Sequence, residues 1–262
     1  MGSMFELWIF VIQYIEMKVI PLSEGSFTID ATKVFVPFDT SKDSLQERNR
    51  GSLLVEVQPF LVITSSDILL LDTGLGFSIN GQMQIHQNLA QHGINANDVT
   101  KVLLSHLHKD HAGGVSYRNR FGHYEAAFPN ATYFVQEREL NNAYELGFPS
   151  YLPDELSILD DTNRVVLLKD DEGWIDQYIH YQVTQGHSKF HQVFSIHTNN
   201  NILFFGGDDA PQLSQMKNRF VAKYDFDGKK CMELRKDWWE KGQQEHWTFL
   251  FYHDIASPSI SL

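Results

Sequence analysis

Short apolar runs separated by polar turns dominate the chain, and this pattern predicts a protein rich in strands. The predicted strands are Leu53–Val57, Phe60–Thr64, Ile68–Leu71, Val102–Leu104, Thr132–Val135, Val165–Leu168, Ile179–Val183, Val193–Ile196, Ile202–Phe205 and Thr248–Tyr252. Helical spacing of apolar residues is clearest in Gln82–His92, Glu137–Leu146 and Met232–Gly242. Because these helices interleave with strands, the pattern predicts an α/β layered domain.

The length of 262 residues fits one domain, so we expect residues 1–262 to form a single domain. Residues 1–16 stand apart as a tag or an apolar N-terminal extension. Within them, Phe5–Ile15 is apolar, lacks a basic flank and is too short to span a bilayer. We expect it to pack on the domain or on a second copy in a homodimer, with a degenerate signal sequence as the alternative.

Composition narrows the partners and the compartment. The chain holds 33 acidic against 21 basic residues, a net charge of −12, which argues against a nucleic-acid partner. Cys231 is the single cysteine, so the sequence allows no intrachain disulfide. These features predict a cytoplasmic protein with no nucleic-acid or membrane partner.

The segment Tyr117–Asp171 has the weakest periodicity and is rich in aromatic residues, Pro and Asn. We expect loops near the entrance of a site here. Its aromatic side chains either line a pocket or serve in packing: Phe121, Tyr124, Phe128, Phe148 and Tyr151.

The run Ser105–Gly114 places three imidazoles and a carboxylate directly after an apolar segment. In extended backbone, residues two apart point the same way, so His106 and His108 can bind one ion. Asp110 and His111 follow a bend and can face a second ion. Imidazole and carboxylate together suit zinc, iron or manganese, and a metal site is therefore the first hypothesis. The glycines Gly113 and Gly114 allow backbone segments to approach closely.

Further ligand types follow other apolar runs. His187 comes after Ile179–Val183, Asp208 after Ile202–Phe205, and His253 after Thr248–Tyr252. The carboxyl ends of strands commonly line a crevice, so these side chains can complete the coordination of an ion. The remaining histidines lack metal spacing and are expected to be surface or core residues: His86, His92, His123, His180, His197 and His246.

These motifs resemble the metallo-β-lactamase superfamily. Leu70-Leu71-Asp72-Thr73-Gly74 matches the Leu-Leu-Asp-Thr-Gly strand end of that family, and His106 to His111 matches its His-x-His-x-Asp-His signature. The resemblance implies an αββα sandwich with a dinuclear site at one edge. It implies His106, His108 and His187 on one metal, Asp110, His111 and His253 on the other, Asp208 as the bridge, and Asp72 as a supporting carboxylate.

Two positions near these ligands need assignment. Asp209 adjoins Asp208, but Asp208 follows Gly207 as in the Gly-Asp of the family, so we assign Asp208 as the bridge and Asp209 as a capping or solvated residue. The loop after His187 departs from the pattern, and His191 is expected to be structural.

The resemblance implies a hydrolase with two divalent metal ions, which we expect to be zinc, with iron or manganese as alternatives. A metal-bound hydroxide would attack a small ester or lactone. Asp110 and Asp208 are the candidate catalytic residues. Asp110 would orient the water or pass a proton to the leaving group.

The nearest branch is that of N-acyl-homoserine lactonases and organophosphate hydrolases, on the stretch Phe128–Gln136. Pro211 stands where the lactonases have a tyrosine three residues after the bridging aspartate. A phosphotriester or thioester hydrolase, or a mononuclear iron persulfide dioxygenase, remains open.

Overall fold

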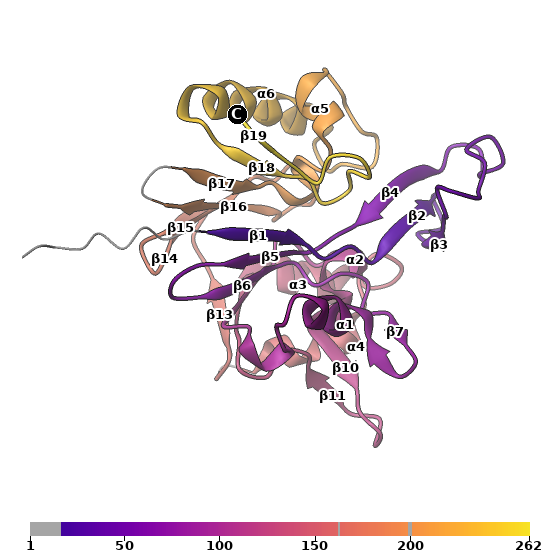
Figure 1. The fold of residues 1–262 in the computed structure, drawn as a ribbon, viewed down its shortest axis with the longest axis vertical. Helices are drawn as coiled ribbons and strands as arrows, with labels where there is room; N and C mark the ends of the chain where they lie inside the picture. The colour runs from indigo at the N-terminus through magenta and orange to yellow at the C-terminus, as the bar shows by residue number, and fades with distance from the viewer. Residues whose placement is uncertain (1–16, 162, 199–200) are drawn as a thin grey trace, which may run out of the picture.

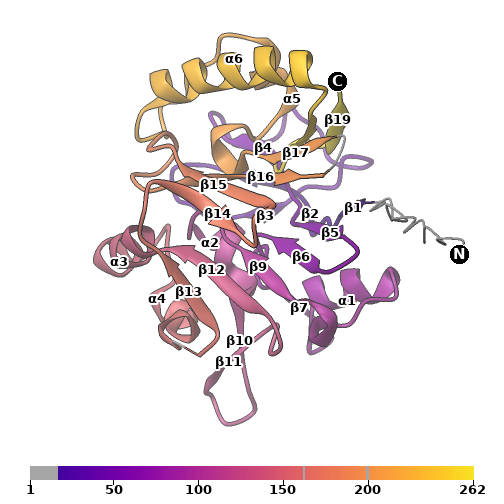
Figure 2. The same cartoon turned by 90° about the vertical axis from the view of Figure 1, so that its left-hand side faces the viewer.

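The computed structural model describes residues 17–161, 163–198 and 201–262. Two six-stranded sheets lie face to face (Figures 1 and 2). The first sheet, in spatial order, contains β1 (Lys18–Pro21), β5 (Phe60–Ile63), β6 (Ile68–Leu71), β9 (Lys101–Leu103), β12 (Thr132–Gln136) and β13 (Val165–Leu168). The second contains β14 (Glu172–Ile175), β15 (Ile179–Val183), β16 (Gln192–His197), β17 (Ile202–Phe205), β18 (Thr248–Leu250) and β19 (Ser259–Ser261).

Helices cover the outer face of each sheet. The first sheet is covered by α1 (Gln84–Gln91), α3 (Glu137–Leu146) and α4 (Pro153–Leu156). The second is covered by α5 (Leu213–Lys217) and α6 (Gly228–Glu245). A short helix, α2 (Lys109–Ala112), lies at the edge between the sheets. The predicted αββα sandwich is confirmed.

Alternate residues along a strand pack into different layers of the sandwich. In β5, Phe60 and Val62 pack between the two sheets, whereas Leu61 between them packs with the helices of the first sheet. In the second sheet, Phe205 faces the first sheet and Phe204 packs against Trp238 of α6. Successive strand residues point to opposite faces, so strands covered on both sides read as the continuous apolar runs seen in the sequence.

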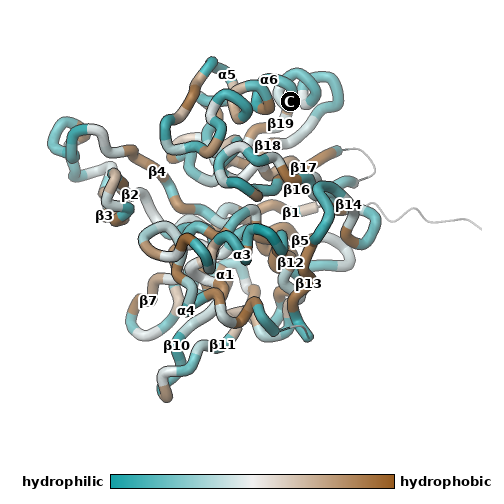
Figure 3. The backbone as a smooth tube through the Cα atoms, turned by 180° about the vertical axis from the view of Figure 1, so that it is seen from behind, coloured by the Kyte–Doolittle hydropathy of each residue, from teal (hydrophilic) through white to brown (hydrophobic). Residues whose placement is uncertain are grey.

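A three-stranded arm projects from the sandwich. It consists of β2 (Gly25–Ile29), β3 (Val36–Pro37) and β4 (Leu53–Val57), with β2 in the middle. Figure 3 shows that β4 is hydrophobic while the loop at the far end of the arm is hydrophilic. Two hairpins complete the described structure: β7 (Ser78–Ile79) with β8 (Gln82–Met83), and β10 (Ser116–Arg118) with β11 (Tyr124–Ala126).

All ten predicted strands and three predicted helices are present, with shifted ends. The helix predicted over Gln82–His92 begins at Gln84, and the one predicted over Met232–Gly242 extends from Gly228 to Glu245. The apolar run Phe5–Ile15 lies outside the described residues, and the single-domain organisation stays a prediction. None of the helices in the described part of the chain is both long and apolar enough to cross a membrane.

Candidate metal centre

The predicted ligands converge because they follow strands that end at one edge of the sandwich. Strands β6 and β9 run parallel in the first sheet, and β17 and β18 run parallel in the second. Asp72 directly follows β6, the His106–His111 run follows β9, and Asp208 and His253 follow β17 and β18. His187 follows β15, which has the same direction as β17 since each is antiparallel to β16.

Close backbone packing holds the His-rich turn in place. The amide of Thr73 donates to the carbonyl of His111 at 2.7 Å, which joins the loop after β6 to α2. A Cβ atom at Gly113 would lie 2.5 Å from the carbonyl oxygen of Leu75, and one at Gly114 would lie 2.1 Å from that of Thr73. Only glycine permits this approach, as the sequence predicted.

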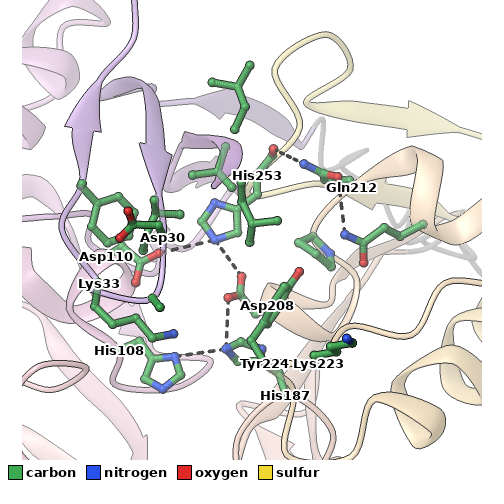
Figure 4. A pocket seen from close by; sticks show the side chains of 18 of the residues that line it. Asp30, Lys33, His108, Asp110, His187, Asp208, Gln212, Lys223, Tyr224 and His253 are labelled. Atoms are coloured by element: carbon green, nitrogen blue, oxygen red, sulfur yellow. Dashed lines mark hydrogen bonds and ion pairs between the residues drawn. The ribbon is translucent and has the colours of Figure 1, made fainter. Parts of the chain in front are cut away.

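Four side chains form the first set of ligand atoms. The Nε2 atoms of His106 and His187 lie 3.0 and 3.1 Å from the Nδ1 atom of His108. His187 Nε2 lies 3.2 Å from Oδ2 of Asp208 (Figure 4). Ligands about 2.0–2.1 Å from a tetrahedral ion lie about 3.3 Å apart, so these spacings fit a first-row metal.

The second set uses the other oxygen of the same aspartate. Oδ1 of Asp208 lies 3.1 Å from His111 Nε2 and 2.9 Å from His253 Nε2. Oδ2 of Asp110 lies 3.7 Å from His111 Nε2 and 3.5 Å from His253 Nε2. The two sets therefore meet at Asp208.

In three of the candidate histidine ligands, the ring nitrogen Nδ1 points away from the other ligand atoms and donates to a hydrogen-bond acceptor. His111 Nδ1 donates to Asp72 at 2.7 Å, and His253 Nδ1 donates to the carbonyl of Glu56 at 2.5 Å. His106 Nδ1 donates to Ser105 Oγ at 3.0 Å, because that hydroxyl itself donates to Asp72. With Nδ1 protonated, each Nε2 directs a lone pair into the site.

These converging lone pairs fit a bound cation. His111 Nε2 and Asp208 Oδ1 are buried and have no hydrogen-bond partner of acceptable geometry among the described residues. Buried polar atoms are normally satisfied, and nitrogen and oxygen lone pairs aimed at one another repel. Divalent ions held by the two ligand sets would satisfy both.

The electrostatics of the site favour positive charge at its centre. Burial and the neighbouring imidazoles lower the pKa of His106 and His108, which keeps both in the neutral form that binds metal. Burial raises the pKa of Asp208, but His253, His111 and His187 outweigh it and hold that pKa well below its usual value. Burial lowers the pKa of His111, and Asp208 and Asp110 more than reverse this shift.

Asp209 is not the capping or solvated residue that the sequence suggested. Its side chain is fully buried and lies 3.0 Å from His191 Nδ1. It also accepts from the amide of His187 at 2.7 Å. Burial raises the pKa of Asp209, but His191 and its other donors lower it to about 2. Since His191 Nε2 in turn accepts from the amide of Asp208, this pair orients two ligand-bearing loops, and His191 is structural as predicted.

Asp225 was missed by sequence reasoning. Its carboxylate lies 2.9 Å from His187 Nδ1, with only 2% of the side chain exposed. It therefore supports His187 as Asp72 supports His111. Asp225 lies in the polar loop before α6, 38 residues from its partner, where no periodicity or motif marks it.

Helix α6 anchors the loops behind the site. Cys231 donates to Asp209 at 3.3 Å, and burial raises the pKa of its thiol, so it is a structural group rather than a nucleophile. Arg235, 1% exposed, donates to the carbonyls of Asp209 and Phe220 at 2.8 and 2.6 Å.

A cavity of about 560 Å³ opens onto the ligand atoms. His108, Asp110, His187, Asp208 and His253 form its floor. Its wall comes from the arm and from the segment 211–224, including Ile29, Phe35, Leu53, Leu54, Val55, Pro211, Phe220 and Tyr224. This volume is typical of small-molecule sites.

The prediction that Tyr117–Asp171 lies at the entrance of the site is wrong for most of that segment. Within 117–161 and 163–171, only Ser150 lines the cavity. Phe128 and Tyr151 are buried packing residues, and Phe121 and Phe148 are 70% and 76% exposed and do not line the cavity. The arm, which carries no marked motif, takes the place that the sequence assigned to these aromatics.

Histidine and aspartate side chains that converge at the strand ends of an αββα sandwich are typical of a class of metal-dependent hydrolases. Residues 55–214 match the metallo-beta-lactamase superfamily, and the chain belongs to that superfamily. This confirms the predicted family and the predicted enzyme class. A comparison with curated proteins gives no match.

Solved structures with the same fold span nearly the whole chain. A probable metal-dependent hydrolase from Staphylococcus aureus is 22% identical, with a TM-score of 0.75 over 95% of this chain and 94% of that one. The hydrolase AbOPH is 21% identical, with a TM-score of 0.72 over 95% and 92%. The dizinc quorum-quenching lactonase AidC, in complex with a product, is 19% identical, with a TM-score of 0.67 over 95% and 91%. At these identities the likeness concerns the fold.

Proposed function

We propose that this chain is a dinuclear metal-dependent hydrolase that cleaves a small carboxylic ester or lactone. The observation that carries the proposal is the position of Asp208, whose Oδ2 faces His187 and whose Oδ1 faces His111 and His253. One carboxylate shared by two sets of ligands is the arrangement that bridges a pair of ions.

Seven residues would hold the two ions. His106, His108 and His187 would bind the first, Asp110, His111 and His253 the second, and Asp208 both. Nitrogen and oxygen ligands at these spacings suit zinc, the metal of the structurally similar lactonase AidC, and also iron or manganese. When bound, such ions lower the pKa of a bound water and polarise a carbonyl group.

The side chains of the protein supply the remaining chemistry. Asp208 stays ionised because the surrounding imidazoles lower its pKa. Asp110 faces the cavity from the floor and can accept or pass on a proton of the attacking water or leaving group.

Tyr224 is the candidate donor to the developing oxyanion, in place of the tyrosine that Pro211 replaces. Its ring centroid lies 6.0 Å from that of His187, and the side chain borders the cavity next to Asp208 (Figure 4). Burial and the negative charge of Asp208 raise the pKa of Tyr224, so its hydroxyl stays protonated and able to donate.

The apolar side chains of the cavity wall favour a substrate with an apolar acyl group. Ile29, Phe35 and Leu53 from the arm face Pro211 and Phe220 across the cavity. Product-bound lactonases of the same fold hold N-hexanoyl-homoserine, which has such a group. A phosphotriester or thioester would use the same floor, and the complete second ligand set favours a dinuclear centre over a mononuclear iron site.

Metal content tests the proposal directly. We expect two divalent ions per wild-type chain, measured by elemental analysis, and hydrolysis of aryl esters and lactones by the loaded protein. The Asp208→Ala variant should lose at least one ion and about 10³-fold or more in kcat/KM, since it removes a ligand from both sets. Asp237→Ala, on the exposed face of α6, is the matched control. Unchanged metal content and turnover in Asp208→Ala would contradict the assignment.

Location and assembly remain part of the proposal. A cytoplasmic location rests on the single cysteine, whose buried thiol is suited to a reducing compartment. A homodimer rests on the apolar N-terminal run alone.

A further inference from the structure

We propose that the substrate carries a second, non-reacting carboxylate and that Lys33 binds it, so the preferred substrates are half-esters or acid-bearing lactones. This inference rests on the proposed hydrolase function and adds a substrate class to it. It comes from the distribution of charge around the cavity.

The cavity is basic in a protein that is otherwise acidic. Apart from the candidate ligands, its charged lining residues are Lys33, Lys109, Lys223 and Asp30. The chain as a whole carries 33 acidic and 21 basic residues. Three ammonium groups at one opening therefore form a local positive field, which attracts anions and is strengthened by the low-dielectric walls of a cavity.

These ammonium groups are available to a ligand. Among the described residues, no carboxylate lies within 4.0 Å of the Nζ atom of Lys33, Lys109 or Lys223. Asp30 forms no ion pair with them, and its carboxylate accepts from the amide and hydroxyl of Thr32 at 2.9 and 2.6 Å. Its single negative charge offsets only part of the three ammonium groups, so the lining outside the candidate ligands is net positive.

Lys33 extends toward the ligand atoms. It leaves the arm at the turn after β2, where the amide of Lys33 donates to the carbonyl of Asp30 at 3.0 Å. Figure 4 shows its side chain extending beside His108, on the floor of the cavity.

The backbone at Lys33 is held in an unfavourable conformation. Its φ is +61°, in the left-handed region that lysine rarely adopts. A glycine or asparagine would occupy this position with less strain. A lysine here is consistent with selection for the side chain rather than for the turn.

Lys109 also contributes to the field. Its Nζ lies 5.9 Å from the ring centroid of Phe35 and 5.8 Å from that of Phe148, so aromatic faces hold it near the cavity. Two ammonium groups close to each other repel, and a bound carboxylate relieves this repulsion.

A ligand that matches both the positive charge of the lysines and the apolar side chains of the wall is amphiphilic. Its acyl carbon chain would lie against Leu53 and Val55 of the arm, and its carboxylate would reach Lys33, near the turn between β2 and β3. A dicarboxylic acid esterified at one end has this form. Hydrolysis adds water across the ester bond, which releases the alcohol and leaves the dicarboxylate.

Two isosteric substrates test the inference. Mono-4-nitrophenyl adipate carries the carboxylate, and 4-nitrophenyl 6-methylheptanoate replaces it with a neutral group of the same shape. The readout is the ratio of kcat/KM for the anionic ester to that for the neutral ester, with uncatalysed hydrolysis subtracted. We expect Lys33→Met to lower this ratio about tenfold, mainly through KM, and Lys33→Arg to restore most of it.

Salt and a matched lysine provide controls. Raising ionic strength from about 0.05 M to about 0.5 M should lower the ratio more for the wild type than for Lys33→Met, which retains Lys109 and Lys223. Lys42→Met removes an exposed lysine from the same arm, outside the cavity, and should leave the ratio unchanged. The inference is overturned if Lys33→Met leaves the ratio unchanged, which includes the case in which it lowers kcat/KM equally for both esters.

A binding measurement separates this inference from the proposed function. Calorimetric titration of the metal-loaded wild type and Lys33→Met with 6-oxoheptanoate, in which a methyl ketone replaces the ester group of an adipate half-ester, measures binding without turnover. If neither aryl ester is hydrolysed but binding still depends on Lys33, the ester hydrolase function fails and the anion site stands. If both esters are hydrolysed and binding is equal in the two proteins, the function stands and the anion site fails.

Discussion

The seven candidate ligands and the cavity wall are adjacent, but they are built in different ways. The ligands lie at the carboxyl ends of strands in the two sheets, and all except His108 are buried or nearly so, with outer atoms fixed by Asp72, Asp225 and the Glu56 carbonyl. The wall comes from the projecting arm and from 211–224, where Leu53, Phe220 and Tyr224 are 38–41% exposed.

This difference separates the reaction from the choice of substrate. The ligand atoms rest on strand ends packed on both faces, where a small displacement disturbs several contacts at once. The wall rests on a three-stranded arm and on the segment 211–224, which includes α5. Because several of its side chains are partly exposed, they can change without disturbing the packing of the sheets. Metal binding should therefore respond to changes at the strand ends, and substrate preference to changes in the wall.

Tyr224 and Asp225 allow the sharpest test, because these neighbours serve the two regions separately. Tyr224→Phe removes the proposed oxyanion donor while keeping the ring beside His187. We expect kcat to fall about 100-fold on esters, with two ions per chain retained, measured by steady-state kinetics and elemental analysis. Tyr117→Phe, on the β10–β11 hairpin, is the control. A loss of metal without a specific loss of kcat would place Tyr224 among the structural residues instead.

We expect Asp225→Asn to reduce metal affinity more than kcat, which is the opposite of Tyr224→Phe. It weakens the acceptor for His187 Nδ1, and loss of such a partner typically costs about 10–100-fold in metal affinity. Competition with a chelator measures this change, and kcat of the fully loaded variant should stay closer to the wild-type value than that of Tyr224→Phe. Asp227→Asn, which alters only the N-cap of α6, serves as the control. Equal metal affinity in Asp225→Asn and the wild type would refute the supporting role.

The smallest effect is expected in the arm. Leu53→Ala removes apolar contact area from the wall without touching a ligand, and Leu53 is already 38% exposed. We expect KM to rise a few-fold for esters with long acyl groups and to change little for acetate esters, since each buried methylene contributes about 0.8 kcal/mol. A uniform loss across acyl lengths would mean that the arm does not contact the acyl group.

The sheets and the ligand motif were predictable because strong local patterns encode them. Strands buried on both faces read as apolar runs, and β5, β6 and β17 were found in this way. Strands at the edges lack that pattern: β1 has one buried residue, and the β10–β11 hairpin is largely exposed. The missed strands are β1, β2, β3, β7, β8, β10, β11, β14 and β19.

The wall was not predictable because no local pattern encodes it. Lys33, Phe35 and Leu53 are brought to the site by the pairing of β2 with β3 and β4, whose sequences show neither strong alternation nor a motif. Asp225 meets His187 through tertiary packing alone. The aromatic composition of Tyr117–Asp171 was misleading, since those side chains pack or lie exposed away from the cavity.

Strand β4 spans both regions. Leu53 and Val55 line the cavity, and one residue further the carbonyl of Glu56 accepts from His253 Nδ1, while the amide of Glu56 donates to the carbonyl of His253 at 3.4 Å. A ligand that orders Leu53 and Val55 therefore also orders the support of a candidate metal ligand. We therefore expect occupancy of the cavity and retention of metal to be thermodynamically coupled. By reciprocity, bound metal would then increase the affinity of the cavity for its ligand by the same factor.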